Sequence, residues 1–480
     1  MPREGNAAIP PVEEIRHVHL VAICGTAMGS LACMLVDRGF HVTGSDTDAY
    51  PPMSDQLAAA GIEVQKGFAA EHVTSPRPDL VVIGNAVRRE NPEARAAIDG
   101  GLPYVSFCDA IHHFFLRGKH SVVITGTHGK TTTTSIVAWM LTHAGRDPSA
   151  LIGGVFQNFS GSFRLGQGPH FVIEGDEYDT AFFDKTPKFL HYDARTLLVT
   201  SVEFDHADIY GSLEQIQGAF RTLVAQLPAD GAIIAATDAD SVREVLGGAR
   251  ARVEGYGFRD GAVWRVSDVA FDPDGTQFTV WRRDERVARV RMPLHGRHNV
   301  ENVLGAIAVC ANLGLEPEAA ARAMADFHGV KRRQELRGEA AGMAVIDDFA
   351  HHPTAVRETI AAIRSRYPNR KLWAILEPRT NTSRRRFFED SFADALATAD
   401  EVILAGVFRS DALAEEERMR PDKVVERIRA AGRRASYLSE VDEIIEHLAR
   451  NRTGRDVALV MSNGGFGGIW DRLLARLNQA

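Results

Sequence analysis

Residues 121–135 read SVVITGTHGKTTTTS and predict a strand, a glycine loop and a helix in direct succession. The strand is expected at Ser121–Ile124, where residues of β-type character gather, and the helix at Thr132–Leu141. Between them, glycines at positions 126 and 129 allow backbone N–H groups to turn inward, and the helix N-terminus adds the positive end of its dipole. Strand, loop and helix in this order form a cradle for the phosphates of ATP or GTP.

Two side chains of this loop have chemical roles in such a cradle. Lys130 is placed to meet the outer phosphates, and the Thr131 hydroxyl to bind Mg²⁺. The common P-loop pattern has another glycine five residues before Gly129, but Ile124 stands there, so the loop is a shortened form. A plain strand–turn–helix corner is the alternative interpretation. The residues predicted to bind ATP here are Gly126, Thr127, His128, Gly129, Lys130, Thr131 and Thr132.

The bulk composition is that of a globular protein with several domains. Its 480 residues correspond to roughly three domains of about 150 residues each. A net charge of −8 gives no reason to expect nucleic acid or membrane as a partner. The four cysteines include no CxxC pair, which argues against a disulfide scaffold or a zinc ribbon. We expect a cytoplasmic protein, because residues 1–14 lack the apolar core of a signal peptide and no apolar run reaches the ~20 residues of a membrane span.

A second strand–turn–helix pattern lies near the start of the chain. His17–Ile23 predicts a buried strand, residues 24–29 (CGTAMG) a turn, and Leu31–Asp37 an apolar helix. A further strand, Phe40–Gly44, ends close to Asp46. The unit is therefore βαβ, with a glycine turn after its first strand and an acidic residue after its second, as in dinucleotide-binding folds.

This turn departs from the dinucleotide fingerprint at two positions. Asp46 follows Gly25 by 21 positions, but Ala27 and Ser30 replace the second and third glycines of the fingerprint. The pattern is weak for NAD and favours another nucleotide, whose diphosphate meets the turn and whose sugar lies near Asp46. Residues 84–86 (GNA) form another loop after a buried strand. The predicted contacts are Gly25, Thr26, Ala27, Met28, Gly29, Asp46 and Asn85.

Acidic residues follow two strands that are predicted beside the P-loop. Residues 171–174 lead into the cluster EGDEYD (174–179), in which one carboxylate is expected to hold Mg²⁺ directly or through water. His206 lies within EFDHAD (203–208), after a strand at Leu197–Ser201. This histidine could be a metal ligand, a proton carrier or a charge partner.

The next segment contains a β insert and a helix start. Residues 262–292 alternate polar and apolar around a Pro-Asp-Gly turn, which predicts an antiparallel insert. GRHNVEN (296–302) then leads into a helix at Val303–Asn312. Asn299 and Asn302, three positions apart, would share one helical face. Their amides could cap the helix or read the edge of a base, since an amide both donates and accepts hydrogen bonds.

Beyond this helix the chain alternates strands and amphipathic helices, which predicts another doubly wound α/β domain. The expected strands are 344–346, 372–376, 402–405 and 457–461. Three of the loops that follow them read DDFAHHPT (347–354), EPRTNT (377–382) and SNGGFGG (462–468). The charged run KRRQE (331–335) before the first of these strands is a candidate hinge.

Together these motifs resemble the Mur ligase family of peptidoglycan synthesis along essentially the whole chain. They are GTHGKT (126–131), EGDEYD, EFDHAD, GRHNVEN, KRRQE and DDFAHHPT. The resemblance implies an α/β fold with three domains. These are a Rossmann-like domain for a UDP-sugar at 1–116, a central P-loop ATPase-type domain at 117–331, and a Rossmann-like C-terminal domain at 332–480 for the acceptor peptide and for closure over ATP.

The resemblance also implies roles for single residues around the P-loop. Lys130 matches the lysine that binds the γ-phosphate, and Thr131 and Glu174 match ligands of Mg²⁺. His206 matches the histidine of a second metal site. The resemblance therefore makes Thr131, Glu174 and His206 the predicted metal ligands.

Further roles follow for the helix and the loops beyond it. Asn299 and Asn302 match asparagines on the adenine side of ATP, while Arg333 and Asp348 match the hinge arginine and the C-terminal contact to ATP. His351 lies where a contact to phosphate or substrate is expected. The candidate catalytic residues are Lys130, His206, Arg333 and His351.

Within the family, the first turn and the C-terminal loops 377–382 and 462–468 most resemble one branch. That branch joins UDP-N-acetylmuramate to the murein tripeptide L-alanyl-γ-D-glutamyl-meso-diaminopimelate during peptidoglycan recycling. The resemblance implies an amide bond made through an acyl phosphate, with ATP and Mg²⁺ and release of ADP and phosphate. The nearest alternative is the branch that adds L-alanine to the same nucleotide. The two C-terminal loops are expected to select the acceptor.

Two interpretations come from other functional classes. A NAD(P)-dependent dehydrogenase would account for the N-terminal βαβ unit and Asp46, but it leaves the P-loop and its acidic partners unexplained. A P-loop regulator or motor would account for the P-loop, and its ATPase activity should proceed without any amino-acid or peptide acceptor.

Overall fold

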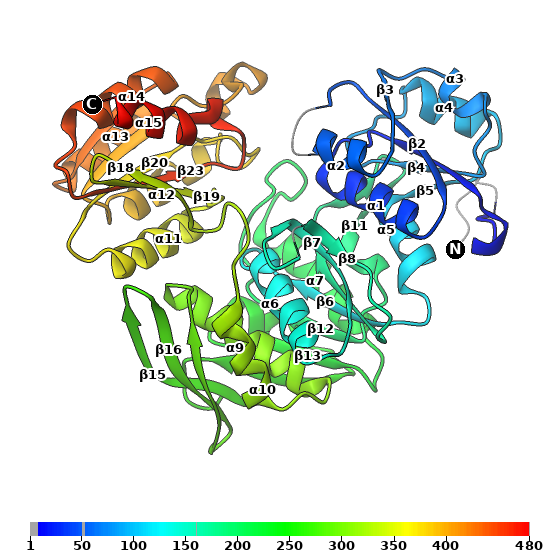
Figure 1. Cartoon of the computed structure of the whole chain (residues 1–480), viewed down its shortest axis with the longest axis horizontal. Helices are drawn as coiled ribbons and strands as arrows, with labels where there is room; N and C mark the ends of the chain where they lie inside the picture. Colours follow the sequence, from blue (N-terminus) through cyan, green and yellow to red (C-terminus); the bar gives the residue numbers. More distant parts are fainter. Residues whose placement is uncertain (1–7, 50–52, 160, 480) are drawn as a thin grey trace. The chain divides into compact units, whose positions relative to one another are not determined.

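The computed structural model describes residues 8–49, 53–159 and 161–479. The chain forms two compact units (Figure 1). Unit 1 consists of the chain up to residue 202 together with 216–235 and 239–254, and unit 2 of 203–215, 236–238 and the chain from residue 255. Among the helices of the described residues, none is long and apolar enough to span a bilayer.

The first sheet of unit 1 is parallel throughout. Its elements are β1 (His17–Val21), α1 (Thr26–Asp37), β2 (His41–Asp46), α2 (Met53–Ala59), β3 (Val64–Lys66), α3 (Glu71–Thr74), β4 (Leu80–Ile83), α4 (Pro92–Asp99), β5 (Tyr104–Ser106) and α5 (Phe107–Ile111). The strand order is β3-β2-β1-β4-β5. Val81 and Ile83 of β4 pack against Val73, Ala94 and Ala97 of α3 and α4, while α1, α2 and α5 lie together (Figure 1). The predicted Rossmann-like arrangement is confirmed.

Helix α1 begins at Thr26, five residues before the predicted start at Leu31. Gly25 caps it in an extended conformation, so the turn passes directly into the helix. Gly29 therefore lies inside α1, where an added Cβ would be 2.1 Å from the sulfur of Met53 in α2. The predicted start was wrong because this glycine permits close helix packing and does not belong to a longer turn.

The second sheet of unit 1 carries the P-loop strand in its interior. Its elements are β6 (His120–Thr125), α6 (Lys130–His143), β7 (Ser149–Phe156), β8 (Gly161–Arg164), β9 (His170–Gly175), β12 (Thr196–Val199), α7 (Leu213–Gln226), β13 (Ala232–Ala236) and α8 (Asp240–Val245). The strands follow the order β13-β12-β6-β9-β7-β8, and all pairs are parallel except β7 with β8. The loops after β6, β9 and β12 thus meet at one edge, where such sheets bind ligands.

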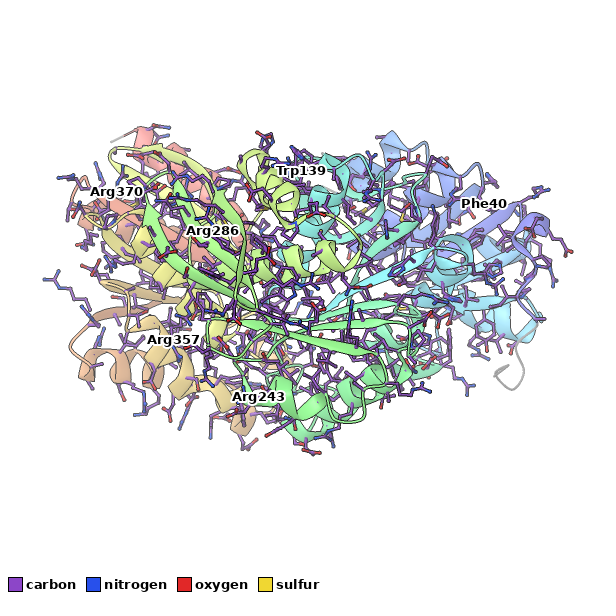
Figure 2. All side chains as sticks on the ribbon, turned by 90° about the horizontal axis from the view of Figure 1, so that it is seen from below. Phe40, Trp139, Arg243, Arg286, Arg357 and Arg370 are labelled. Carbon is purple, nitrogen blue, oxygen red and sulfur yellow. The ribbon has the colours of Figure 1, made fainter. Side chains whose placement is uncertain are left out.

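A short hairpin and an antiparallel meander complete the central elements. The hairpin after β9 is β10 (Asp179–Ala181) and β11 (Asp184–Pro187), and the later strands are β14 (Arg252–Gly257), β15 (Trp264–Asp272), β16 (Gly275–Arg282) and β17 (Glu285–Met292). The antiparallel pairing of β15, β16 and β17 confirms the predicted insert. Along β17, Ala288 and Val290 are buried whereas Arg289 and Arg291 are exposed, and Arg286 near the start of the strand also faces solvent (Figure 2). Their alternation has the period of a strand.

Helix α9 (Arg297–Asn312) includes six residues that were predicted to precede it. Gly296, with a φ of 97°, turns the chain into this helix, and this backbone region favours glycine. Asn299 and Asn302 consequently lie in its first turns, both buried, and Asn302 Nδ2 donates to Asn299 Oδ1 at 3.3 Å. The prediction that the two asparagines share one helical face is confirmed. The short helix α10 (Pro317–Arg322) follows.

The remaining sheet of unit 2 is a doubly wound α/β layer, as predicted. Its elements are β18 (Glu335–Ala340), β19 (Met343–Asp348), α11 (Pro353–Arg366), β20 (Lys371–Leu376), α12 (Glu389–Leu396), β21 (Glu401–Ala405), α13 (Pro421–Ala430), β22 (Arg434–Leu438), α14 (Val441–Asn451), β23 (Asp456–Met461) and α15 (Ile469–Asn478). The order is β18-β19-β23-β20-β21-β22, with only β18 antiparallel. Leu372 and Ala374 of β20 pack with α11 to α13, whereas Trp373 and Ile375 pack with α14 and α15.

Candidate functional site

The loop after β6 is held by the end of β12. Gly126 has a φ of 130°, and an added Cβ would lie 2.1 Å from the Thr200 hydroxyl. The backbone N–H groups of Thr127 and His128 donate to the carbonyl and hydroxyl oxygens of Ser201, at 3.0 and 2.9 Å. These two N–H groups therefore fix the loop, and the first turn of α6 supplies the N–H groups that can face a phosphate.

Lys130 occupies the first position of α6, directly after Gly129, which has a φ of 79°, and its side chain is only 12% exposed. Its Nζ donates to Glu177 Oε2 and to the Gly126 carbonyl, both at 2.8 Å. Burial by itself would lower the pKa of the amine, but the carboxylates of Glu177 and Asp176 outweigh it and raise the pKa above its usual value. The lysine is therefore a fixed positive charge.

Glu174 and Thr131, two of the three predicted metal ligands, lie side by side. The Thr131 hydroxyl donates to Glu174 Oε1 at 3.1 Å, and the Gly153 N–H of β7 donates to Glu174 Oε2 at 2.9 Å. An added Cβ at Gly153 would be 2.5 Å from the same carboxylate oxygen. The two side chains place oxygen donors side by side, which is the ligand chemistry that Mg²⁺ requires.

Glu177 belongs to the acidic cluster EGDEYD, but its position in the sequence predicts no separate role for it. Glu177 is 2% exposed and is the carboxylate that pairs with Lys130. The neighbouring Asp176 instead pairs with Lys188, at 2.9 Å. The signal that could have identified the site was the EGDEYD cluster as a whole, because residue spacing does not say which of its acids turns toward the loop.

The predicted UDP-sugar residues lie at the carboxyl ends of three adjacent strands of unit 1. Gly25 follows β1, Asp46 ends β2, and Asn85 follows β4. The Cys24 N–H donates to Asp46 Oδ2 at 2.9 Å, so this carboxylate also holds the turn in which Gly25 lies. An added Cβ at Gly84 would lie 3.6 Å from Met28 Cγ, which places the GNA loop against the first turn of α1.

In unit 2, two predicted histidines gather around a buried carboxylate. Burial opposes ionisation of Asp205, but the charges of His206 and His351 hold the pKa of Asp205 well below its usual value. His351 Nε2 lies 4.0 Å from Asp205 Oδ2. The segment is tied to α11 because the Thr354 hydroxyl donates to Glu203 Oε2 at 2.6 Å. His206 and His351 are thus brought together.

Asp348 and Arg333 lie close to one another at the candidate hinge. Asp348 Oδ2 accepts from the Gln334 N–H and Oδ1 from the Ala350 N–H, each at 2.8 Å. The Arg333 guanidinium lies 4.8 Å from the centre of the Phe349 ring. The carboxylate of Asp348 therefore orders the backbone on both sides of β19, and a cation–π contact holds the hinge arginine beside it.

Comparison with protein-family models matches three consecutive parts of the chain. Residues 17–118 match the Mur ligase family, catalytic domain; residues 124–310 match the Mur ligase middle domain; and residues 332–464 match the Mur ligase, glutamate ligase domain. A UDP-N-acetylmuramate–L-alanyl-γ-D-glutamyl-meso-2,6-diaminoheptandioate ligase of Escherichia coli strain K12 is 41% identical over 95% of this chain and 97% of its own length. The chain belongs to the Mur ligase family.

This Mur ligase is also similar to a second curated relative and to a solved structure. A UDP-N-acetylmuramate–L-alanine ligase of Geobacter sp. strain M21 is 32% identical over 97% of this chain and 99% of its own length. A solved structure of a murein peptide ligase from Psychrobacter arcticus 273-4 has a TM-score of 0.73 and 37% identity, covering 97% of this chain and 99% of that one. The structural likeness confirms the predicted α/β fold.

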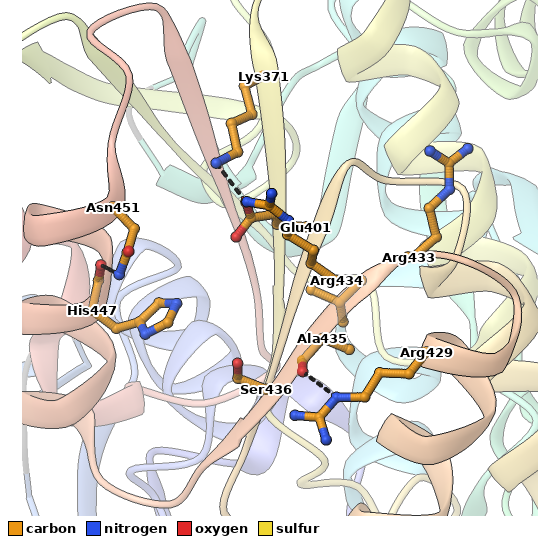
Figure 3. Close-up of a pocket in the computed structure, with 10 residues that line it drawn as sticks. Lys371, Glu401, Arg429, Arg433, Arg434, Ala435, Ser436, His447 and Asn451 are labelled. Carbon is orange, nitrogen blue, oxygen red and sulfur yellow. Dashed lines mark hydrogen bonds and ion pairs between the residues drawn. The ribbon is translucent and has the colours of Figure 1, made fainter.

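The C-terminal sheet of this Mur ligase also has a hollow at the opposite, amino ends of its strands. The hollow has a volume of about 420 Å³ and is lined largely by basic side chains (Figure 3). Lys371 and Arg434 both pair with Glu401, at 2.6 and 3.3 Å (Figure 3). The loops after β19, β20 and β23 leave the other edge of the sheet. The hollow is therefore separate from the predicted acceptor loops.

Glu301, one turn beyond Arg297 in α9, is a carboxyl group in an unfavourable environment. Burial raises its pKa to about 7, and the nearby charge of Asp238 adds to the effect, while Arg297 opposes it. A carboxyl whose pKa is raised in the folded state costs stability once the pH exceeds its ordinary pKa. This cost grows between its ordinary value and about pH 7.

Replacing Glu301 by Gln should therefore stabilise the protein at alkaline pH. We expect Glu301→Gln to raise the free energy of unfolding by about 2 kcal/mol at pH 8 and to leave it nearly unchanged at pH 4. Urea denaturation followed by circular dichroism at both pH values measures the difference. The exposed Glu416, replaced by Gln, is the control and should give no such difference. Equal stability of Glu301→Gln and wild type at pH 8 would contradict the prediction.

Proposed function

We propose that this Mur ligase is an ATP-dependent amide ligase that joins UDP-N-acetylmuramate to the tripeptide L-alanyl-γ-D-glutamyl-meso-diaminopimelate. The observation that carries the proposal is the convergence of Lys130, Thr131 and the Glu174 carboxylate on one P-loop. It is supported by 41% identity to a relative that is named for these two substrates. The reaction would serve the recycling of peptidoglycan in the cytoplasm.

Each part of the chain has a proposed share in this reaction. Residues 1–116 would bind the UDP-sugar, residues 117–331 would bind ATP, and residues 332–480 would bind the acceptor peptide. The proposed UDP-sugar contacts are Gly25, Thr26, Ala27, Met28, Gly29, Asp46 and Asn85. The proposed ATP contacts of the loop and the first turn of α6 are Gly126, Thr127, His128, Gly129, Lys130, Thr131 and Thr132.

Amide formation requires prior activation, because a carboxylate does not expel its own oxygen. The lactyl carboxylate of UDP-N-acetylmuramate attacks the γ-phosphorus of ATP, which gives an acyl phosphate and ADP. The free α-amine of the peptide then attacks the acyl carbon, loses a proton, and displaces phosphate from the tetrahedral intermediate. Neither step needs a covalent bond to the protein, so positioning and neutralisation of charge supply the catalysis.

Lys130 is the residue of this chain best placed to neutralise that charge. Its side chain is already largely shielded from water, and its ammonium group is oriented by Glu177 and by the Gly126 carbonyl. When ATP binds, the γ-phosphate would take the place of Glu177 as the partner of the ammonium group. Because the group is charged and oriented beforehand, little reorganisation is needed as charge develops on the phosphoryl oxygens.

Thr131 and Glu174 are the residues that would hold Mg²⁺, and their adjacent oxygens fit this hard cation. When bound, the ion would neutralise charge on the phosphates. His206 is the proposed ligand of a second metal. Gly153 would not bind the ion itself, but its N–H orients the carboxylate of the proposed ligand Glu174.

The other proposed contacts lie in unit 2. Asn299 and Asn302 would bind the adenine side of ATP, and Arg333 and Asp348 would contact ATP from the hinge. His351 would contact phosphate or substrate. Their support is that α9 orients both asparagines on one face, that the Phe349 ring holds Arg333, and that Asp205 holds His351.

Replacing Lys130 by Ala should abolish most turnover without affecting the sugar nucleotide. We expect kcat to fall about a hundredfold or more, because a preorganised charge at the transferred phosphoryl group is lost. Phosphate release measures turnover, and calorimetric titration should show UDP-N-acetylmuramate binding within about twofold of wild type. Lys185→Ala removes an exposed lysine near the same acidic cluster and should leave both turnover and UDP-N-acetylmuramate binding unchanged. Near-normal ligation by Lys130→Ala would refute this role.

Replacing Glu174 by Gln should raise the Mg²⁺ concentration that supports half-maximal activity by about tenfold. Gln keeps an oxygen that can accept from the Gly153 N–H, so the local fold should be preserved, whereas the ligand loses its charge. A magnesium titration of phosphate release measures the shift. Asp179→Asn removes another acid of the cluster and is the control. The proposal for Glu174 fails if its variant keeps the wild-type magnesium dependence.

The choice of acceptor is tested by comparing the tripeptide with L-alanine. With UDP-N-acetylmuramate and ATP, we expect kcat/KM for the tripeptide to exceed that for L-alanine about a hundredfold. Preference for L-alanine would instead support the alternative named by the Geobacter relative. ADP release without any acceptor would indicate a P-loop regulator or motor, and a change in NAD(P)H absorbance would indicate a dehydrogenase.

A further inference from the structure

One side chain of the candidate hinge is held by contacts that the proposed chemistry does not use. Arg332 has a φ of 61°, a left-handed conformation that is uncommon for a residue with a Cβ. Its N–H donates to Glu335 Oε2 at 2.8 Å, and its carbonyl accepts from the Phe349 N–H at 2.9 Å. These contacts hold the backbone in a conformation that it would not prefer alone.

The Arg332 guanidinium is enclosed by aromatic rings and a carboxylate. Its central carbon lies 5.4 Å from the centre of the Phe349 ring and 5.2 Å from that of Trp470. Its Nε donates to the buried Asp347 Oδ1 at 3.4 Å. The side chain is 28% exposed, so its direction is set by packing rather than by water.

The outer end of this guanidinium reaches the loop after β23. Arg332 Nη2 donates to the carbonyl oxygens of Ser462 and Gly464, at 2.6 and 2.8 Å. A charged donor shared by two main-chain carbonyls stabilises the turn that brings them together. Arg332 therefore defines the conformation at the start of the loop 462–468, which is one of the two predicted acceptor loops.

The same turn is joined to the second predicted acceptor loop, 377–382. The Ser462 hydroxyl donates to Glu377 Oε2 at 2.5 Å. An added Cβ at Gly464 would lie 2.1 Å from Arg379 Nε, so the Arg379 side chain passes directly over this glycine. Displacement of the 462–464 turn would disturb Glu377 and Arg379 as well.

We propose that Arg332 is a positioning residue for the acceptor peptide, and that it acts by holding the turn 462–464 in the shape that both acceptor loops require. The inference rests on the proposed function, because it assigns these loops to the peptide. The two arginines of the hinge then have different roles. Arg333 contacts ATP, whereas Arg332 positions the acceptor peptide by holding the backbone of the loop.

The test is Arg332→Gln in the full-length protein, with Arg337→Gln as a matched control. Arg337 also contacts Asp347 and lies 5.9 Å from the Trp470 ring, but its ion-pair partners among the described residues are Asp347 and Asp471. We expect KM for the tripeptide to rise about tenfold in Arg332→Gln, with KM for ATP and for UDP-N-acetylmuramate within about twofold of wild type. Arg337→Gln should leave all three constants near their wild-type values.

Hydrogen exchange supplies a readout that does not depend on ligation. The Gly464 N–H donates to Ser462 Oγ, and its exchange should be about tenfold faster in Arg332→Gln and unchanged in Arg337→Gln. Arg332→Lys keeps the charge but lacks the planar group, so it should remain impaired in both measurements, and it serves if the Gln variant does not fold.

The inference would be overturned if Arg332→Lys had the wild-type tripeptide KM and exchange rate, or if Arg332→Gln and Arg337→Gln changed them equally. It would also be overturned if the tripeptide KM of Arg332→Gln were that of wild type. Failure of the proposed function has a different signature, because wild type itself would then not ligate the tripeptide.

Discussion

The candidate site depends on one constraint, which is that the Lys130 side chain is largely shielded from water, with 12% of its surface exposed. A cation removed from water is tolerated only where carboxylates and carbonyls replace its hydration. Glu177 and the Gly126 carbonyl do so here, each at 2.8 Å. They keep the group charged and aimed at the loop, and a triphosphate would only have to replace Glu177 as its partner. The loop supplies the Gly126 carbonyl and the acidic cluster supplies Glu177, so both contribute to holding this one charge.

Glycines allow the functional groups of this Mur ligase to approach the backbone closely. An added Cβ would lie 2.1 Å from the Thr200 hydroxyl at Gly126, 2.5 Å from the Glu174 carboxylate at Gly153, and 2.1 Å from a guanidinium nitrogen at Gly464. In each case a side chain or a strand end occupies the space that a Cβ would need. The glycines near the P-loop and the acceptor loops are thus needed for close packing of neighbouring groups as well as for turns of the backbone.

Elements with a strong local pattern were predictable from the sequence. The strands β21 (Glu401–Ala405) and β23 (Asp456–Met461) contain continuous apolar runs, and the predicted ranges 402–405 and 457–461 each differ from the actual bounds by one residue. The strand β22 was missed, because RASYL (434–438) is short, largely polar and lies at the edge of its sheet. Its strand conformation depends on pairing with β21. The pattern of polar and apolar residues within these five positions does not reveal that pairing.

The sequence by itself determined the P-loop, because its strand, its glycines and the Lys130–Thr131 pair act on neighbours along the chain. Only the tertiary structure decided which acid faces which partner: Glu174 is directed to Thr131, and Glu177 to the lysine. It also decided that Arg332 reaches a loop carbonyl 130 positions away. The physical reason is that the direction of a side chain depends on the packing of elements far apart in the sequence, whereas spacing along the chain fixes only local geometry.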